Sequence, residues 1–328
     1  MNKSLVFLFS GQGSHYYHMG SELFKNLPVF KKCILDLDSI AKGVIGESII
    51  SRIYDVNKKR GSGFDRTLYS HPAIFMVEYS LAHTLIEAGV IPEYVLGTSL
   101  GEFTAAVVSG VLSAEEALRL IIKQAEYLEC YCETGGMIAI LHNPVLYYET
   151  PFIFKKSELV SINYDEHFVI SSSKANLSEI KEYLDKNNVS HHVLDVSYAF
   201  HSEGINKAGK YYTEFLKEKR FNRTHIPYMS CVYGDFTDMI PKDFFWQVVR
   251  KPILFQKAID KMEESGAKAY VDVGPGGTLA GFVKRYIGKG AMSEVYPTMT
   301  PFPTEMKNLN VILDKFCTKY DKEERQDE

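Results

Sequence analysis

The sequence has little of what marks secreted, membrane-spanning or nucleic-acid-binding proteins. It contains five cysteines and one tryptophan in 328 residues. No apolar run approaches the roughly 20 residues that a membrane-spanning helix needs. The formal net charge is −4, and the lysines and arginines are scattered, so no basic field is available to hold nucleic acid. We therefore expect a soluble, cytoplasmic protein without a membrane or nucleic-acid partner.

The cysteines form neither a disulfide framework nor a metal-binding pattern. Their number is odd and their spacing irregular, which is typical of a reducing compartment. A Cys-x-Cys pair occurs at 130–132, but no second pair or suitably spaced histidine follows it. We expect free thiols and no metal. The cysteines are Cys33, Cys130, Cys132, Cys231 and Cys317.

Alternating strand and helix patterns make up most of the chain, whose 45% hydrophobic content suffices for a sizeable core. The apolar run at 5–9 is too short for a signal peptide and lacks a small-residue cleavage site, so it predicts a buried strand. Ser113 and Glu116 form a capping-box pattern that begins a helix reaching about residue 131. Further strands are expected at 94–96 and 269–273, and further helices at 71–88 and 102–108.

A segment with a different pattern interrupts this alternation after Gly135-Gly136. It contains short strand patterns and one helix pattern, which predict a small α+β insertion. The strands are expected at 137–141, 159–163, 168–172 and 192–196, and the helix at 177–187. The large α/β domain then comprises 1–131 and 198–316, the small subdomain 132–197, and a charged tail 317–328.

Residues 97–101 read Gly-Thr-Ser-Leu-Gly, a Gly-x-Ser-x-Gly motif. A strand pattern precedes the motif and a helix pattern follows it, as in the sharp turn that presents a nucleophilic serine. Ser99 would be that nucleophile. The backbone N–H of Leu100 would then lie at a helix N-terminus, where it can stabilise an oxyanion. The five residues alone also fit a tight structural turn.

A serine nucleophile needs a base, and several histidines follow Ser99. His201 stands out because it comes directly after the inserted segment, where the chain re-enters the large domain. A histidine satisfied in the core or at the surface is the alternative interpretation. The candidates are His142, His167, His191, His192, His201 and His225.

The loop after the first strand reads Gly-Gln-Gly-Ser at 11–14. It has no Gly-Lys-Ser/Thr ending and no third spaced glycine, so it is not a phosphate-binding loop. The sequence favours a turn whose backbone N–H groups point at one spot, with a plain tight turn as the alternative.

Taken together, these motifs resemble the malonyl-CoA:acyl-carrier-protein transacylase family, and most closely the trans-acting acyltransferases and acyl hydrolases of polyketide synthases. The likeness runs from about residue 5 to residue 315. The chain has His-Pro-Ala-Ile-Phe at 71–75 where the family has Gln-Pro-Ala-Leu-Phe, and Gly-Thr-Ser-Leu-Gly-Glu at 97–102 where it has Gly-His-Ser-Leu-Gly-Glu. The other landmarks are residues 11–14 with Met19-Gly20, Asn163, Phe200-His201-Ser202 and residues 273–276.

The resemblance implies an α/β-hydrolase-like large domain with a parallel sheet and an inserted ferredoxin-like subdomain. It also implies that Ser99 accepts the acyl group and that His201 serves as base and then acid. A backbone carbonyl, here that of Leu254, would orient His201. The N–H groups of Gln12 and Leu100 would form the oxyanion hole.

Two departures from the family pattern concern the acyl pocket. Members that use malonyl groups carry an arginine that pairs with the free carboxylate, and Gln124 stands at that position. Lys123 is adjacent, but helical geometry turns it about 100° away. Recruitment of another cation by the pocket is the alternative. Thr98 replaces the usual histidine, which also indicates altered selectivity.

Other residues expected to contact the acyl group are Phe200, Asn163 and Tyr198. The stretch from Tyr198 to His201 mixes two of the family's specificity patterns, so it does not identify a substrate. We favour a hydrolase that removes acetyl or longer uncharged acyl groups from acyl carrier protein. The alternatives are an acyltransferase between coenzyme A and carrier protein, and a non-catalytic carrier-binding subunit. The partners would be acyl carrier protein and acyl-CoA, with no cofactor beyond the phosphopantetheine that the carrier brings.

Overall fold

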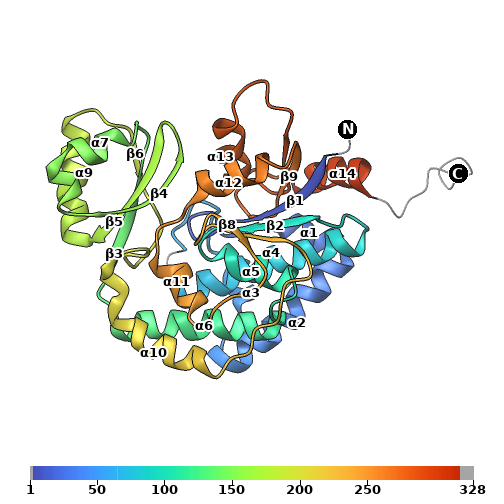
Figure 1. Ribbon diagram of the computed structural model, residues 1–328. Coiled ribbons are helices and arrows are strands. Elements are labelled where there is room, and N and C mark those ends of the chain that lie inside the picture. The colour runs from blue at the N-terminus through green and yellow to red at the C-terminus, as the bar shows by residue number, and fades with distance from the viewer. Residues whose placement is uncertain (1–2, 65, 318–328) are drawn as a thin grey trace, which may run out of the picture.

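A mainly parallel sheet forms the centre of the larger part of the molecule (Figure 1). The computed structural model describes residues 3–64 and 66–317, so the predicted tail lies outside the described residues apart from Cys317. Within these residues the sheet has six strands in the order β10-β9-β1-β2-β7-β8, all parallel except β8. The strands are β1 (Ser4–Phe9), β2 (Tyr94–Gly97), β7 (Tyr228–Ser230), β8 (Asp235–Thr237), β9 (Lys268–Asp272) and β10 (Glu294–Pro297).

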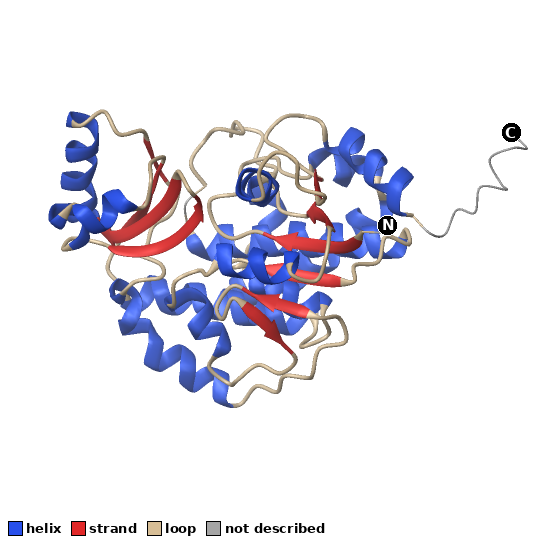
Figure 2. Cartoon of the chain, turned by 45° about the horizontal axis from the view of Figure 1, so that its top comes forward, coloured by secondary structure: helices blue, strands red, loops and turns tan. Residues whose placement is uncertain are grey.

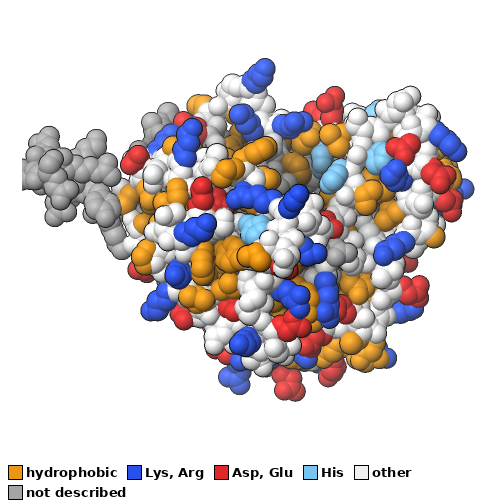
Figure 3. All heavy atoms as spheres, turned by 180° about the vertical axis from the view of Figure 1, so that it is seen from behind, with side chains coloured by type: hydrophobic (Ala, Val, Ile, Leu, Met, Phe, Trp, Pro, Cys, Tyr) orange, Lys and Arg blue, Asp and Glu red, His pale blue; other side chains and the backbone are white. Residues whose placement is uncertain are grey.

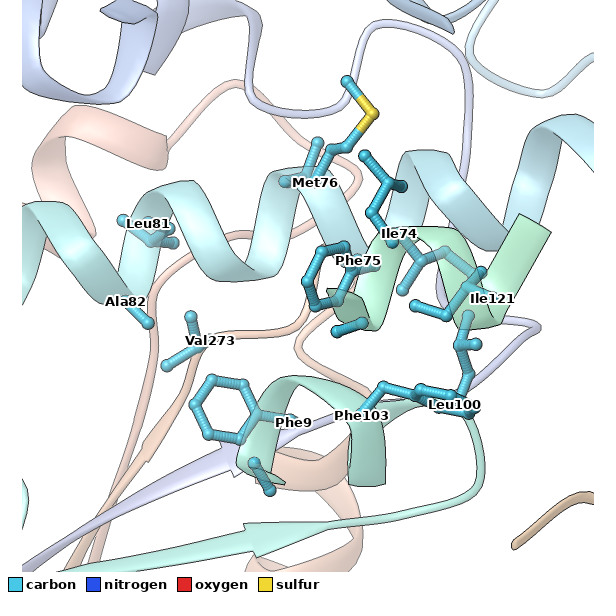
Figure 4. Packing of buried hydrophobic residues seen from close by; sticks show 14 of the residues in the cluster. Phe9, Ile74, Phe75, Met76, Leu81, Ala82, Leu100, Phe103, Ile121 and Val273 are labelled. Carbon is cyan, nitrogen blue, oxygen red and sulfur yellow. The ribbon is translucent and has the colours of Figure 1, made fainter. Parts of the chain in front are cut away.

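Helices cover both faces of this sheet, which explains why β1 is apolar without alternation. Phe7 and Phe9 pack into the cluster formed with α2, α4, α5 and α6, whereas Val6 and Leu8 pack against α12 and α13 on the other face. Figure 4 shows Phe9 and Val273 beneath helix α4 and its Phe75. The helices are α1 (Ser21–Asn26), α2 (Pro28–Ile45), α3 (Ile49–Ile53), α4 (Thr67–Glu87), α5 (Gly101–Val108), α6 (Ala114–Tyr131), the 3-10 helix η1 (Glu203–Ile205), α10 (Asn206–Lys217), α11 (Phe244–Arg250), α12 (Phe255–Glu263), α13 (Thr278–Tyr286) and α14 (Glu305–Phe316).

A second, antiparallel sheet stands apart from the first, as Figures 1 and 2 show. Its strand order is β4-β5-β3-β6, and its helices are inserted between β3 and β4 and between β5 and β6. This is the ferredoxin-like β-α-β-β-α-β arrangement. Its elements all lie within the segment predicted as the small subdomain. They are β3 (Gly135–Ile140), α7 (Val145–Glu149), α8 (Pro151–Phe154), β4 (Glu158–Tyr164), β5 (His167–Ser173), α9 (Lys174–Lys186) and β6 (His191–Val193).

The topology confirms the predicted fold class, and one predicted strand is shorter than expected. The capping box is present, because the Ser113 hydroxyl accepts from the Glu116 N–H at 3.2 Å and Glu116 bonds back to the Ser113 N–H. The strand predicted at 192–196 ends at Val193. Beyond it the chain bends, with the Val196 N–H bonded to the Leu194 carbonyl, and leaves the sheet toward His201.

Candidate active site

Ser99 occupies a sharp turn between strand β2 and helix α5. Its backbone has φ of +51°, a conformation that a non-glycine residue adopts at a cost. The turn lies tightly against the end of β1, since the Thr98 N–H donates to the Phe9 carbonyl at 2.9 Å. A Cβ on Gly101 would stand 2.1 Å from that same carbonyl oxygen, so only glycine fits there. The second glycine of the motif is therefore a steric requirement of this turn.

The loop at 11–14 lies directly against the serine. A Cβ on Gly11 would stand 2.8 Å from the Ser99 Cβ, which shows how closely the two backbones approach. Buried Glu78 on helix α4 holds the start of this loop, accepting from the Ser10 N–H at 2.7 Å and the Ser10 hydroxyl at 2.8 Å. This fixes the backbone of Gln12 beside Ser99.

His201 completes the pair with Ser99. Its Nε2 lies 2.8 Å from the Ser99 Oγ, and its Nδ1 lies 2.7 Å from the backbone carbonyl oxygen of Lys251. The carbonyl can only accept, so Nδ1 carries the hydrogen and the Nε2 lone pair faces the serine hydroxyl. The expected partner, Leu254, is wrong. Its carbonyl accepts from the Ala258 N–H at 3.0 Å instead, because Leu254 is the N-cap of helix α12.

The environment of His201 keeps the ring neutral. The side chain is 1% exposed, and this burial lowers its pKa to about 4. The Lys251 carbonyl opposes the shift by favouring the protonated ring, while the nearby Arg250 charge lowers the pKa further. A neutral imidazole with a free Nε2 lone pair can take a proton from the serine hydroxyl at physiological pH.

Because the pKa of His201 is lowered to about 4, activity should persist to a lower pH than an ordinary histidine base would allow. Protonation of Nε2 removes the lone pair, so kcat/KM for an acyl thioester should be full above about pH 5 and fall as the pH drops through about 4. The measurement is a pH profile from 3.5 to 8, with fluorescence of Trp246 reporting that the fold persists at each pH. A limb centred at the ordinary histidine pKa would contradict this account.

Two backbone N–H groups at the site are available to an oxyanion. Within residues 3–64 and 66–317, neither Gln12 N–H nor Leu100 N–H donates to another protein group. Gln12 directly follows Gly11, where an added Cβ would stand 2.8 Å from the Ser99 Cβ. Leu100 is the N-cap of helix α5. That these two N–H groups form an oxyanion hole, with the partial positive charge of the α5 N-terminus behind them, stays a prediction.

A cavity of about 470 Å³ opens from Ser99 and His201 between the large domain and the small subdomain. Apolar side chains make up most of its wall, including those of β3, β4 and β5 on the subdomain side. In Figure 3 the surface is hollowed beside the small subdomain, with histidine and lysine or arginine side chains around the hollow. Predicted site residues in this wall are Gln12, Thr98, Leu100, Gln124, Asn163 and Phe200.

Gln124 lies in this wall at 2% exposure. Its Nε2 donates to the Phe245 backbone carbonyl at 3.1 Å, so one of its donors is already used. Lys123 is turned away as expected and forms an ion pair with Glu126. The wall position where the resemblance led us to expect an arginine in malonyl-using members is therefore neutral here.

Tyr198 is the one predicted substrate contact that lies outside the cavity wall. The side chain is buried in a hydrophobic cluster with Leu128 and Val249, and its ring meets the Phe200 ring edge-on at 6.2 Å. The segment from Val196 to Phe200 is irregular, so alternation did not indicate which of its side chains faces the cavity. Tyr198 supports Phe200, which does face it.

Three histidines and one arginine of the wall were not predicted to line the acyl cavity, although two of the histidines were among the candidate bases. They are His71, His167, His192 and Arg285. Asn163 Nδ2 lies 3.0 Å from His167 Nδ1, and Arg285 donates to the Tyr164 hydroxyl at 3.1 Å. Only His71 left a signal in the sequence, because it stands where the resembled motif has glutamine. The others come from distant segments that only the fold brings together.

No group of three or more histidine, cysteine, aspartate or glutamate side chains in the described part of the chain could hold a metal ion. No helix there is both long and apolar enough to cross a membrane.

Comparison with known proteins gives concordant matches. The family profile described as acyl transferase domain matches residues 6–320. The chain is 47% identical to the polyketide biosynthesis acyltransferase homolog PksD of Bacillus subtilis, over 95% of this chain and 96% of that protein. It is 44% identical to the homolog BaeD of Bacillus velezensis, over 97% and 98%. The malonyl CoA-acyl carrier protein transacylase structure from Clostridium perfringens superposes with a TM-score of 0.78 at 28% identity, covering 95% and 96%.

Proposed function

Because the chain belongs to the acyl transferase domain family, we propose that it is a trans-acting acyl hydrolase of a polyketide synthase. It takes acetyl or longer uncharged acyl groups from acyl carrier protein onto Ser99 and releases them to water. The observation that carries this proposal is the hydrogen-bonded Ser99–His201 pair beside a cavity whose carboxylate-binding position holds Gln124. The names of PksD and BaeD support the polyketide setting.

Acylation follows from the hydrogen bonds of the site. Ser99 Oγ attacks the thioester carbonyl carbon while its proton passes to His201 Nε2, 2.8 Å away. The Gln12 and Leu100 N–H groups stabilise the oxyanion, and the Lys251 carbonyl holds the imidazolium through Nδ1–H. Collapse breaks the carbon–sulfur bond, and the phosphopantetheine thiolate takes the proton from Nε2 as it leaves.

Deacylation uses the same groups in the second half of the cycle. His201 Nε2, now neutral again, takes a proton from a water molecule that attacks the Ser99 ester. The same N–H groups hold the second oxyanion. The carbon–oxygen bond to Ser99 breaks, the serine recovers its proton from His201, and the free acid leaves. The chain needs no cofactor of its own for either half.

The cavity favours uncharged acyl groups. A malonyl carboxylate near Gln124 would leave water for a mostly apolar wall without a matching cation, and such desolvation is unfavourable by several kcal/mol. A saturated acyl chain gains free energy in the same place, by about 0.8 kcal/mol for each buried methylene. This difference is the reason to expect removal of uncharged chains rather than loading of extender units.

Transfer between coenzyme A and carrier protein is the second candidate, and Arg285 is the observation in its favour. It is the one arginine in the described wall of the cavity. Its side chain is exposed at the end of α13 while Gln124 is buried, so a carboxylate that reached Arg285 would lie toward solvent. A non-catalytic carrier-binding subunit is the third candidate, and the Ser99–His201 hydrogen bond argues against it.

The test compares acetyl-carrier and malonyl-carrier protein as substrates, with free acid and acyl-enzyme followed by mass spectrometry. We expect free acetate, an acetylated Ser99 peptide and little malonate. Efficient passage of malonyl from coenzyme A to the carrier, with little free acid, would overturn the hydrolase in favour of the transferase.

Gln124→Arg should restore part of the malonyl activity. The new guanidinium supplies the missing charge partner, so kcat/KM for malonyl thioesters should rise by about tenfold or more, while acetyl turnover falls. Gln124→Met is the matched control, since it keeps the length of the side chain and adds no charge. An equal malonyl rate in both variants would mean that position 124 does not face the acyl group.

A further inference from the structure

The loop at 11–14 ends on a hydroxyl group that the proposed mechanism does not use. The Ser14 side chain is 6% exposed, and its Oγ lies 2.8 Å from the backbone carbonyl oxygen of Gly11. A carbonyl oxygen only accepts, so the single hydrogen of the Ser14 hydroxyl is donated to Gly11. This bond closes the turn and fixes the direction in which the Gly11 carbonyl points.

The Gly11 carbonyl and the Gln12 N–H belong to one peptide group. That group is planar and trans, so its C=O and its N–H point in opposite directions. By holding the carbonyl, Ser14 also sets the direction of the Gln12 N–H, which is one of the two donors of the proposed oxyanion hole. Rotation of this peptide group would put a carbonyl oxygen in place of the N–H, and a carbonyl oxygen repels an oxyanion.

Such a rotation needs a restraint, because it turns about the backbone of a glycine. Gly11 has no Cβ and so limits its own ψ angle little. The Gln12 side chain is held on helix α4, since its Oε1 lies 2.8 Å from His71 Nε2 and its Nε2 donates to the Ser70 hydroxyl at 3.1 Å. These two bonds fix the amide at the end of the side chain and leave the peptide group before Gln12 to be restrained by Ser14.

The Ser14 hydroxyl is itself held by a buried partner. The Ser10 Oγ lies 2.9 Å from the Ser14 Oγ and 2.8 Å from Glu78 Oε1. Because the Ser14 hydrogen is donated to the loop carbonyl, the Ser10 hydrogen is the one shared between Ser14 and Glu78. Packing keeps Ser10 in place, since a Cβ on Gly274 would stand 2.3 Å from the Ser10 Oγ. The position of Ser14 is therefore fixed from helix α4 through Ser10.

We propose that Ser14 is a positioning residue, which holds the 11–12 peptide group so that the Gln12 N–H faces the oxyanion formed from the thioester carbonyl. This inference rests on the proposed function and gives the last residue of the Gly-Gln-Gly-Ser loop a role. It applies to acylation and deacylation alike, because both pass through an oxyanion. Since Ser14 acts through Gln12 on the transition state, its removal should slow the reaction and leave the binding of substrate nearly unchanged.

Ser14→Ala tests the proposal in the full-length protein with acetyl-N-acetylcysteamine as the thioester. We expect kcat to fall by about tenfold or more, with the unfolding temperature close to that of the wild type. Ser109→Ala is the matched control, because it removes a buried serine hydroxyl that donates to a backbone carbonyl, that of Ala106 at 3.1 Å, outside the cavity wall. The control should keep the wild-type kcat. An unchanged kcat in Ser14→Ala would overturn the proposal.

Two inhibitors separate an effect on the oxyanion from a loss of packing. The first is a trifluoromethyl ketone linked to N-acetylcysteamine through sulfur. Ser99 Oγ bonds to its carbonyl carbon, the serine proton passes to His201 Nε2, and the carbonyl oxygen becomes an oxyanion. The second inhibitor has a methylene in place of the carbonyl. In Ser14→Ala the affinity for the ketone should fall by about the same factor as kcat/KM, and the affinity for the methylene compound should stay within about twofold. Equal losses for both compounds would assign the effect to packing and overturn the proposal.

The proposed function and the role of Ser14 fail on different results. A wild-type protein that forms no acyl-enzyme on Ser99 with any thioester would remove the proposed function itself. A wild-type protein that forms the acyl-enzyme, together with a Ser14→Ala variant that forms it equally fast, would remove only the role of Ser14.

Discussion

Replacement of Ser99 by alanine should reduce the release of free acid by about 10⁴-fold or more, and no acylated protein should accumulate. Alanine keeps the Cβ and the left-handed backbone at φ +51°, so the fold should be unaffected. The loss would therefore belong to the missing Oγ, which is the atom that lies 2.8 Å from His201 Nε2.

The measurement is intact-protein mass after mixing with acetyl-carrier protein, together with the rate of acetate release. Ser51→Ala, on the exposed face of the short helix α3, is the control and should retain full activity. Full activity in Ser99→Ala as well would remove the mechanism, including the roles of His201 and the two N–H groups.

Replacement of Gly101 by alanine should destabilise the turn that carries Ser99, and with it the whole protein. Gly101→Ala places a Cβ 2.1 Å from the Phe9 carbonyl oxygen, and both segments belong to the buried centre of the sheet. Relief requires the turn to move away from β1, which should lower the free energy of unfolding by about 3 kcal/mol or more and abolish activity with it.

Gly43→Ala provides the matched comparison. Gly43 lies in helix α2, and a Cβ there meets nothing within 4 Å. Alanine should raise the free energy of unfolding by about 0.5–1 kcal/mol, because it restricts the unfolded chain and favours the helix. Urea denaturation followed through Trp246 measures both variants. A Gly101→Ala protein as stable as wild type would show that the turn is less tightly packed than its distances indicate.

Local patterns accounted for much of the fold. The unbroken apolar run of β1 follows from burial on both faces of a parallel sheet, and the capping box follows from the hydrogen bonds of one helix terminus. The order of the strands did not follow from such patterns. β7 pairs with β2 although more than a hundred residues separate them, and nothing local encodes that pairing.

Some residues of the candidate site could likewise be predicted from the sequence, and others could not. Ser99 lies in a Gly-x-Ser-x-Gly motif that itself indicates a nucleophile, whereas the role of His201 was predicted from the family resemblance. The carbonyl that holds His201 belongs to Lys251 because α11 ends at Arg250 and the chain turns there, a matter of backbone path that side-chain identity does not encode. Tyr198 was misplaced for a related reason, since an irregular segment offers no periodicity that assigns its faces.

The large domain holds His201 in place, although in the sequence this residue directly follows the small subdomain. Although His201 directly follows the small subdomain, its backbone N–H and its ring are both held by carbonyls of the large domain, those of Val249 and Lys251. The subdomain supplies cavity wall but none of the hydrogen bonds that align the imidazole with Ser99. Substitutions in that wall can therefore change which acyl group is accepted while His201 stays aligned with Ser99. The fold can thus acquire new substrates without changes in its catalytic residues.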